Sequence, residues 1–530
     1  MTAPTALDRL PTRDYMRRLL AGLALLALAA CGGGREGSRN TLDYYFTYDP
    51  RSLDPALSTD VPTGEVVAML FDNLTRFDVQ GNLQPGLATR WETDSSGRTY
   101  TFHLRSGVKF HDGRALTARD VEASYLRALA PGTSGGRSWP LYPIAGARAY
   151  AADSAKAVEG MKVVDDSTIV FTLQTPLNIF PKLLAMPVAA IVPTPTPAGF
   201  DQNPVGSGPW RFVSWSHDDQ IVLAKNPAYW AGAPKSDTLR IRIVPEPLTQ
   251  AAEYEAGRLS VVEVPFGETK RWEERHAKEL QRQPTIHDLY IAINTTRGPL
   301  RDVRVRRALN HAVDVGTILA TVMSNRGVRA AGALPPGITG YDSTRAPYAY
   351  DPAKAKQLLA EAGYAKGFPL KLWRSQRPEY ARIAQAVQQD LAKVGVKVEI
   401  VERDAASARA AARKGETDLF LTDWWADYPD PENFTYPLFH SSNFGPGGNY
   451  AFFKDPRLDD FIVRARTTPD SALKESLARE SDAMVFEAAP WIFLWFPVDL
   501  WAERPDVTGW HVPKVFYGQQ WLEAHRTTAP

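Results

Sequence analysis

Apolar and polar positions alternate most regularly between residues 370 and 421, where short apolar runs flank two amphipathic segments. The apolar runs have the length of buried strands, and the amphipathic segments repeat apolar residues at helical spacing before a glycine. Strands that alternate with helices predict a parallel sheet with right-handed crossovers. The predicted strands are 370–373, 396–401 and 419–421; one helix buries Ile383, Val387 and Leu391 before Gly395, and the other spans 405–413 before Gly415.

The rest of the chain mixes strands and helices without an internal repeat. A strand is predicted at 99–104, and residues 117–120 form a capping box that opens a helix ending before Pro131. A further helical face comprises Val66, Val67, Leu70, Phe71 and Leu74. Other predicted strands are 43–47, 211–215, 239–244, 289–294 and 491–496; other predicted helices are 302–313, 352–362, one opening at Pro456, and 471–487.

Aromatic and acidic residues are concentrated at 423–431, directly after the third strand of the regular pattern. Two indoles, a phenol and three carboxylates lie there, and Pro429 and Pro431 prevent a helix or ladder from continuing. Ligands of open α/β sheets bind beyond the carboxyl ends of the strands. Flat apolar walls with an anionic group suit a small cationic organic ligand. The alternative is a buried aromatic loop with solvated carboxylates.

Length, charge and tryptophan content indicate a protein of several domains and argue against a nucleic-acid-binding protein. A chain of 530 residues is too long for one ordinary core, so two or three domains are expected. The net charge is +1 without a basic block, which argues against a nucleic-acid partner. The 14 tryptophans are more than packing usually requires, and an aromatic-lined ligand cleft is one use for them, although large α/β proteins also bury many.

The only cysteine, Cys31, follows a segment typical of bacterial export signals. Two arginines at 17–18 precede an apolar run at 19–30, which is too short for a stable membrane span. Residues 28–31 resemble the lipobox of lipoprotein signals, in which cleavage leaves a cysteine that carries lipid chains. A plain secretory signal with an incidental cysteine is the alternative.

The sequence also predicts a tether after this signal and a later start of the natural chain. Residues 32–39 begin with three glycines and are expected to form a flexible tether. Asp8 and Asp14 are unusual in the first part of an export signal, so Met16 is the expected natural start. No other apolar run approaches eighteen residues, so the mature protein is expected to be soluble behind its anchor.

Six short motifs occur in order along the chain: 52–55 with 70–74, 83–88 with 100–105, 109–113 with 116–121, 203–210, 294–296 with 302–308, and 426–431. In sequence and spacing they resemble the family 5 extracellular solute-binding proteins, the receptors of oligopeptide and dipeptide ABC importers. The resemblance covers nearly the whole mature chain. Each motif alone is a weak signal, but the series is specific for the family, though not for the ligand.

The resemblance implies an α/β fold of the periplasmic-binding-protein type II class (cluster C). In this fold two α/β lobes enclose a cleft and a third lobe is an insertion. The implied divisions are a signal peptide at 1–31, a tether at 32–39, lobe I at 40–71, 184–285 and 488–530, lobe II at 72–183, and lobe III at 286–487.

The resemblance also implies a ligand anchor. In peptide-binding members, the aspartate of the Ala-Asp-Tyr segment pairs with the α-ammonium of the peptide, and Asp427 occupies that position. Trp424 and Trp425 would wall the first side-chain pocket beside Tyr428. Trp425 departs from the family pattern, because a smaller residue is common there. Asp427 could instead cap the following turn, and Trp424 and Tyr428 could belong to the core.

Three further residues are weaker candidates. Thr63 and Glu65 lie where some relatives place an acidic residue near the carboxyl end of the ligand. Arg374 follows a predicted parallel strand and is a candidate for binding a ligand carboxylate.

The resemblance implies an extracytoplasmic receptor that binds dipeptides or oligopeptides by lobe closure and delivers them to an ABC permease. We expect an exported monomer that is anchored to the membrane through Cys31, without a cofactor, bound metal or enzymatic activity. The main alternative is a non-peptide solute, such as an oligosaccharide, a nickel chelate, haem, an opine or glutathione. A secreted hydrolase is a remote alternative, because the chain has no nucleophile elbow, zinc-protease motif, P-loop or dinucleotide-binding motif.

Overall fold

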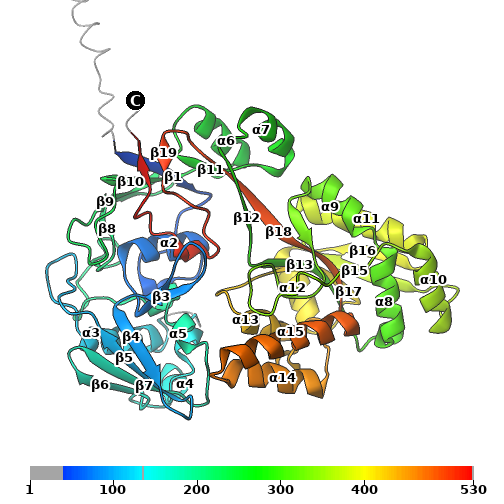
Figure 1. Cartoon of the computed structure of the whole chain (residues 1–530), viewed down its shortest axis with the longest axis horizontal. Helices are drawn as coiled ribbons and strands as arrows, with labels where there is room; N and C mark the ends of the chain where they lie inside the picture. The colour runs from blue at the N-terminus through cyan, green and yellow to red at the C-terminus, as the bar shows by residue number, and fades with distance from the viewer. Residues whose placement is uncertain (1–39, 134–136, 528–530) are drawn as a thin grey trace, which may run out of the picture.

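The computed structural model describes residues 40–133 and 137–527. Its strands and helices form two masses on either side of a long strand, β18 (Figure 1). The predicted signal, tether and Cys31 lie outside the described residues. In the part of the chain that the structure describes, no helix is both long enough and apolar enough to cross a membrane.

The first mass contains a four-stranded sheet in the order β1-β10-β9-β8, in which only the β1–β10 pair is parallel. Helix α2 packs on it, and the turn before β8 fits against the end of this helix. A Cβ at Gly206 would lie 1.9 Å from the carbonyl oxygen of Leu70, so only glycine permits this approach. The bounds are β1 Thr41–Phe46, α2 Val61–Leu70, β8 Trp210–Ser216, β9 Gln220–Lys225 and β10 Thr238–Ile243.

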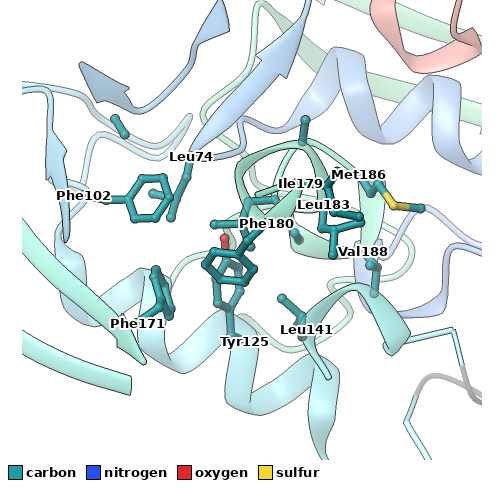
Figure 2. Packing of buried hydrophobic residues seen from close by; sticks show 14 of the residues in the cluster. Leu74, Phe102, Tyr125, Leu141, Phe171, Ile179, Phe180, Leu183, Met186 and Val188 are labelled. Atoms are coloured by element: carbon teal, nitrogen blue, oxygen red, sulfur yellow. The ribbon is translucent and has the colours of Figure 1, made fainter. Parts of the chain in front are cut away.

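A second, antiparallel sheet in the same mass has the order β4-β5-β7-β6. Helix α3 covers it, and Thr117 and Asp120 form the predicted capping box. Phe102, Phe171 and Phe180 pack together in this core with ring centroids 5.6–6.4 Å apart (Figure 2). The bounds are β4 Ala88–Thr93, β5 Thr99–Leu104, α3 Ala118–Leu129, β6 Met161–Asp165, β7 Thr168–Thr172 and α5 Phe180–Leu183.

The second mass is built on the β18-β13-β17-β15-β16 part of a sheet whose full order is β11-β18-β13-β17-β15-β16, and β14 adds to it by pairing with β18. At the other end of β18, β11 and β12 pack with β1 of the first mass. Strand β15 is parallel to both β16 and β17, so the predicted alternation of parallel strands and helices is confirmed. The bounds are β11 Val261–Glu263, β12 Leu280–Pro284, β13 His287–Ile293, β14 Gly327–Arg329, β15 Pro369–Arg374, α11 Pro378–Ala392, β16 Lys397–Glu402, α12 Ala405–Arg413, β17 Leu419–Trp425 and β18 Trp491–Glu503.

Strand β18 joins the two masses. Its first part pairs with β13 and β14, and its last part pairs with β11 and β12. The crossing point is Pro497, whose carbonyl oxygen accepts hydrogen bonds from the backbone N–H of Thr285 at 3.1 Å and from its hydroxyl at 2.9 Å. Thr285 lies between β12 and β13. The chain therefore passes between the two masses twice at this place, once along β18 and once between β12 and β13.

Three predicted elements differ from the structure by more than two residues at one end. Strand β18 continues past the predicted end at 496, and β17 continues through Trp425 instead of ending at 421. Helix α2 ends at Leu70, so Leu74 is buried but lies outside it. The remaining elements are β2 Thr75–Phe77, β3 Leu83–Pro85, α4 Ala147–Ala151, α6 Pro247–Glu255, α7 Thr269–Arg275, α8 Val303–Ala312, α9 Val315–Met323, α10 Pro352–Glu361, α13 Pro431–Phe439, α14 Pro456–Thr467, α15 Ser471–Ala488, β19 Val507–Thr508, β20 His525–Arg526, and short 3₁₀ turns.

Candidate functional site

The end of β17 separates the two neighbouring tryptophans. Successive side chains of a strand point to opposite faces, so Trp424 and Trp425 cannot wall one pocket together. Trp424 packs into the core, where its indole N–H donates to the Asn433 side chain at 3.2 Å. Trp425 is 57% exposed. Trp424 thus takes the core position that the sequence left open for it, and of the two indoles only Trp425 lines the cavities described next.

Trp425 lies where three cavities meet, and it lines all of them. Its ring stacks on His287, its cross-strand partner on β13, with centroids 4.0 Å apart. The cavities are lined by residues of both masses, so they form a groove between them. We name them the Asp427 pocket, the indole pocket and the Arg377 pocket.

The Asp427 pocket has a volume of about 340 Å³. The Asp427 backbone is fixed on both sides, because its N–H donates to Asn433 at 3.3 Å and its carbonyl accepts from the hydroxyl of Tyr517. Among the described residues, no cationic side chain forms an ion pair with its carboxylate, although Arg137 lines the same cavity. Burial raises the pKa of Asp427, and Arg137 only partly offsets this effect. A ligand ammonium would supply the missing charge.

The indole pocket has a volume of about 300 Å³ and adjoins the Asp427 pocket along Val61, Trp425, Ala426 and Phe516. An aromatic series forms one wall, with centroid distances of 5.4 Å for Trp501–Trp510, 6.1 Å for Trp510–Trp521 and 5.0 Å for Trp521–Tyr44. Glu65 and Asp499 also line this pocket.

The Arg377 pocket has a volume of about 280 Å³ and shares Trp425 and Asp499 with the indole pocket. Arg377 precedes α11, and its half-exposed guanidinium donates to the Asp423 carboxylate at 3.0 Å. His287 lies 3.4 Å from the same carboxylate. Burial raises the pKa of Asp423, but His287 and Arg377 more than offset it and hold that pKa well below its usual range. Arg377 thus brings a cation to this end of the groove, where it is paired with Asp423 and where Glu263, Glu379 and Asp499 also line the pocket.

Three other predicted site residues are placed elsewhere. Tyr428 is buried in the core and donates its hydroxyl to Glu432. Thr63 is fully buried, and its hydroxyl donates at 2.9 Å to Asp60, the residue that caps α2. Arg374 is buried in an ion pair with Glu402. The structure therefore does not bring Tyr428, Thr63 or Arg374 to the groove, whereas Asp427, Trp425 and Glu65 line it.

Sequence reasoning missed most of the lining residues, including Arg377, His287, Asp499, Trp501, Trp510 and Trp521. Arg377 had a local signal, because it immediately precedes the proline that opens α11 and so lies in the loop after β15. Trp501, Trp510 and Trp521 had no local sequence signal, because only the tertiary fold brings them beside β17.

Two masses joined at a strand crossing, with a groove between them lined by indoles and charges, define a small-molecule receptor. Over residues 40–133 and 137–527, no cluster of three or more His, Cys, Asp or Glu is arranged to hold a metal ion. The chain belongs to the bacterial extracellular solute-binding proteins, family 5, whose family model matches residues 82–446. This family consists of binding proteins and not enzymes, which excludes the hydrolase alternative.

Several characterised proteins are similar along almost their whole length. The glutathione-binding protein GsiB of Pectobacterium atrosepticum is 34% identical over 478 residues, covering 87% of this chain and 89% of the relative. Heme-binding protein A of Haemophilus influenzae is 32% identical and the dipeptide-binding protein of Escherichia coli 31% identical. Both comparisons cover 93% of this chain and 96% of the relative.

Solved structures confirm the predicted type II fold. HbpA2 from Haemophilus parasuis has a TM-score of 0.83 and 28% identity, covering 92% of this chain and all of the other. The dipeptide-binding protein of a Pseudoalteromonas species, in complex with Met-Leu, has a TM-score of 0.71 and 27% identity with the same coverage.

Proposed function

We propose that this chain is the extracytoplasmic receptor of an ABC importer and that it binds short peptides in the groove around Trp425. The observation that carries the proposal is Asp427, a desolvated carboxylate that no side chain of the described residues neutralises by an ion pair. Arg377 offers the opposite charge on the other side of Trp425. Together the two groups match the two ends of a zwitterionic peptide, which agrees with the dipeptide- and glutathione-binding relatives.

The arrangement of the chain supports binding by closure of lobes with the predicted divisions. The groove takes its lining from both masses, so a ligand that touches both favours the state in which they are close. Mass spectrometry of the ligand released from the purified protein tests the function directly. Peptides are expected, and a sugar, a chelate or a porphyrin as the main ligand would overturn the proposal.

Replacing Arg377 with glutamine should weaken the binding of peptides with a free carboxyl terminus by about tenfold or more, because a charge-assisted hydrogen bond is lost. Peptides with an amidated carboxyl terminus should bind the variant and the natural protein equally well. Calorimetry with paired free and amidated peptides measures the difference.

The matched control is Arg382→Gln, because Arg382 lies on the same helix with an exposed side chain. This control should bind both peptides like the natural protein. Equal losses for free and amidated peptides in Arg377→Gln would show that Arg377 does not contact the carboxylate.

The export signal leads to a separate proposal, that Cys31 is the lipid attachment site. Cys31→Ser should release the protein from the membrane fraction and abolish its labelling by a radioactive fatty acid. The serine variant has no thiol at residue 31 to carry the acyl chains that anchor the protein. Fractionation and labelling of cells that express both forms measure this. Lipid label that persists in the variant would place the anchor elsewhere.

A further inference from the structure

The indole pocket contains two carboxylates that come from different elements. Glu65 projects from α2, and Asp499 projects from β18 just beyond the crossing point. Neither forms an ion pair with any lysine, arginine or histidine of the described residues. Two acidic groups thus face one cavity of about 300 Å³ without a partner of opposite charge.

Among the residues that the structure describes, Lys514 is the one cation that lines this pocket, and its ammonium lies toward another segment. A Cβ at Gly337 would lie only 2.8 Å from the Lys514 amine nitrogen. The ammonium therefore lies against the loop around Gly337, and no ion pair links it to Glu65 or Asp499. When both carboxylates are ionised, the acidic groups that line this pocket outnumber its lysine.

The surroundings of the two carboxylates favour a cation over water. The walls carry Trp425, Trp501, Trp510 and Trp521, and indole faces attract cations more strongly than other aromatic rings. Burial raises the pKa of Glu65 to about 8, with a partial offset from a hydrogen bond with Tyr44. Burial also raises the pKa of Asp499, and Glu263 adds to this while Arg326 opposes it. Burial is the main cause of both shifts, and the neighbouring groups offset it only in part.

We propose that the indole pocket binds the cationic side chain of a peptide, an arginine or a lysine, at a position next to the amino terminus. The pocket adjoins the Asp427 pocket along four shared residues, so a peptide held at Asp427 reaches it with a nearby side chain. The guanidinium or ammonium would lie between the two carboxylates and against the indoles. This inference rests on the proposed peptide-binding function and specifies the class of peptide.

Calorimetry with four tripeptides tests the inference: Arg-Gly-Gly, Gly-Arg-Gly, and the same two peptides with citrulline in place of arginine. Citrulline keeps the shape of arginine and lacks its charge, so each pair isolates the cation. One arginine peptide should bind at least about tenfold more tightly than its citrulline partner. Glu65→Gln and Asp499→Asn should each reduce that ratio, because each variant removes one of the two carboxylates that face the cation.

The outcomes separate this inference from the proposed function. Equal affinities within both pairs in the natural protein would overturn the cation pocket and leave peptide binding intact. Failure of all four peptides to bind would overturn the proposed function and this inference with it. Because the comparison of peptides uses the natural protein, the inference stays testable even if one variant does not fold.

Discussion

Replacing Asp427 with asparagine is expected to weaken the binding of peptides with a free amino terminus by about 1.5–3 kcal/mol. The substitution keeps the shape of the side chain and removes its charge. The carboxylate lies in a cavity where burial already raises its pKa, so its bond to an ammonium is poorly screened by water. Calorimetry at neutral pH measures the loss, and an unchanged unfolding temperature shows that the fold is intact.

Acetylation of the peptide provides the matched control for this result. The acetylated peptide lacks the ammonium, so it should bind the natural protein weakly and the Asp427→Asn variant no more weakly. The four affinities form a double-mutant cycle that isolates the pair. If the acetylated and free peptides lose the same affinity in the variant, Asp427 does not contact the amino terminus.

Replacing Asp430 with alanine is expected to lower the free energy of unfolding by about 3–5 kcal/mol, the usual cost of breaking a buried ion pair. Asp430 is 1% exposed, and one of its oxygens accepts from Lys182 at 2.7 Å and from Lys474 at 2.6 Å. Its other oxygen caps α13 through the backbone N–H of Glu432 at 3.0 Å. Removing it leaves two ammonium groups without their counter-charge.

Urea unfolding of Asp430→Ala and of a control, Asp470→Ala, measures this effect. Asp470 caps α15 with an exposed side chain and has no ion pair among the described residues, so its loss should cost about 1 kcal/mol. Similar losses in both variants would show that Asp430 acts only as a cap.

The same carboxylate predicts a dependence on pH. Burial raises the pKa of Asp430, but Lys182 and Lys474 more than offset this and hold it at about 2, below the ordinary 3.8. A lowered pKa in the folded state adds stability above about pH 4, and this contribution is lost as the pH falls toward 2. Acid should therefore destabilise the natural protein more than the Asp430→Ala variant.

Much of the fold could be predicted because its signals are local. The strands and helices between 370 and 421 each carry their own apolar period, the two helices are followed by their own glycines, and the structure reproduces these elements. The length of a strand is a weaker signal. Strand β17 extends to Trp425 because it pairs with β13 as far as His287, and that partner lies over a hundred residues away.

The site was harder to predict because a shift of one residue changes which way a side chain points. Trp424 and Trp425 are adjacent, but the pleat of β17 sends one into the core and the other into the groove. Arg374 ends β15 and pairs with Glu402 of the neighbouring strand, while Arg377, three residues later, reaches the groove. Asp427 was found because the motif that contains it is contiguous.

In the lobe closure that we propose, the crossing of β12, β13 and β18 at Pro497 is the expected hinge. When one lobe rotates about a hinge, residues close to the hinge move less than residues far from it. Asp499 follows the crossing by two residues and lines both the indole pocket and the Arg377 pocket, whereas Asp427 lies beyond the end of another strand. We therefore expect the part of the groove around Asp499 to keep its geometry while the lobes close, and the part around Asp427 to change most.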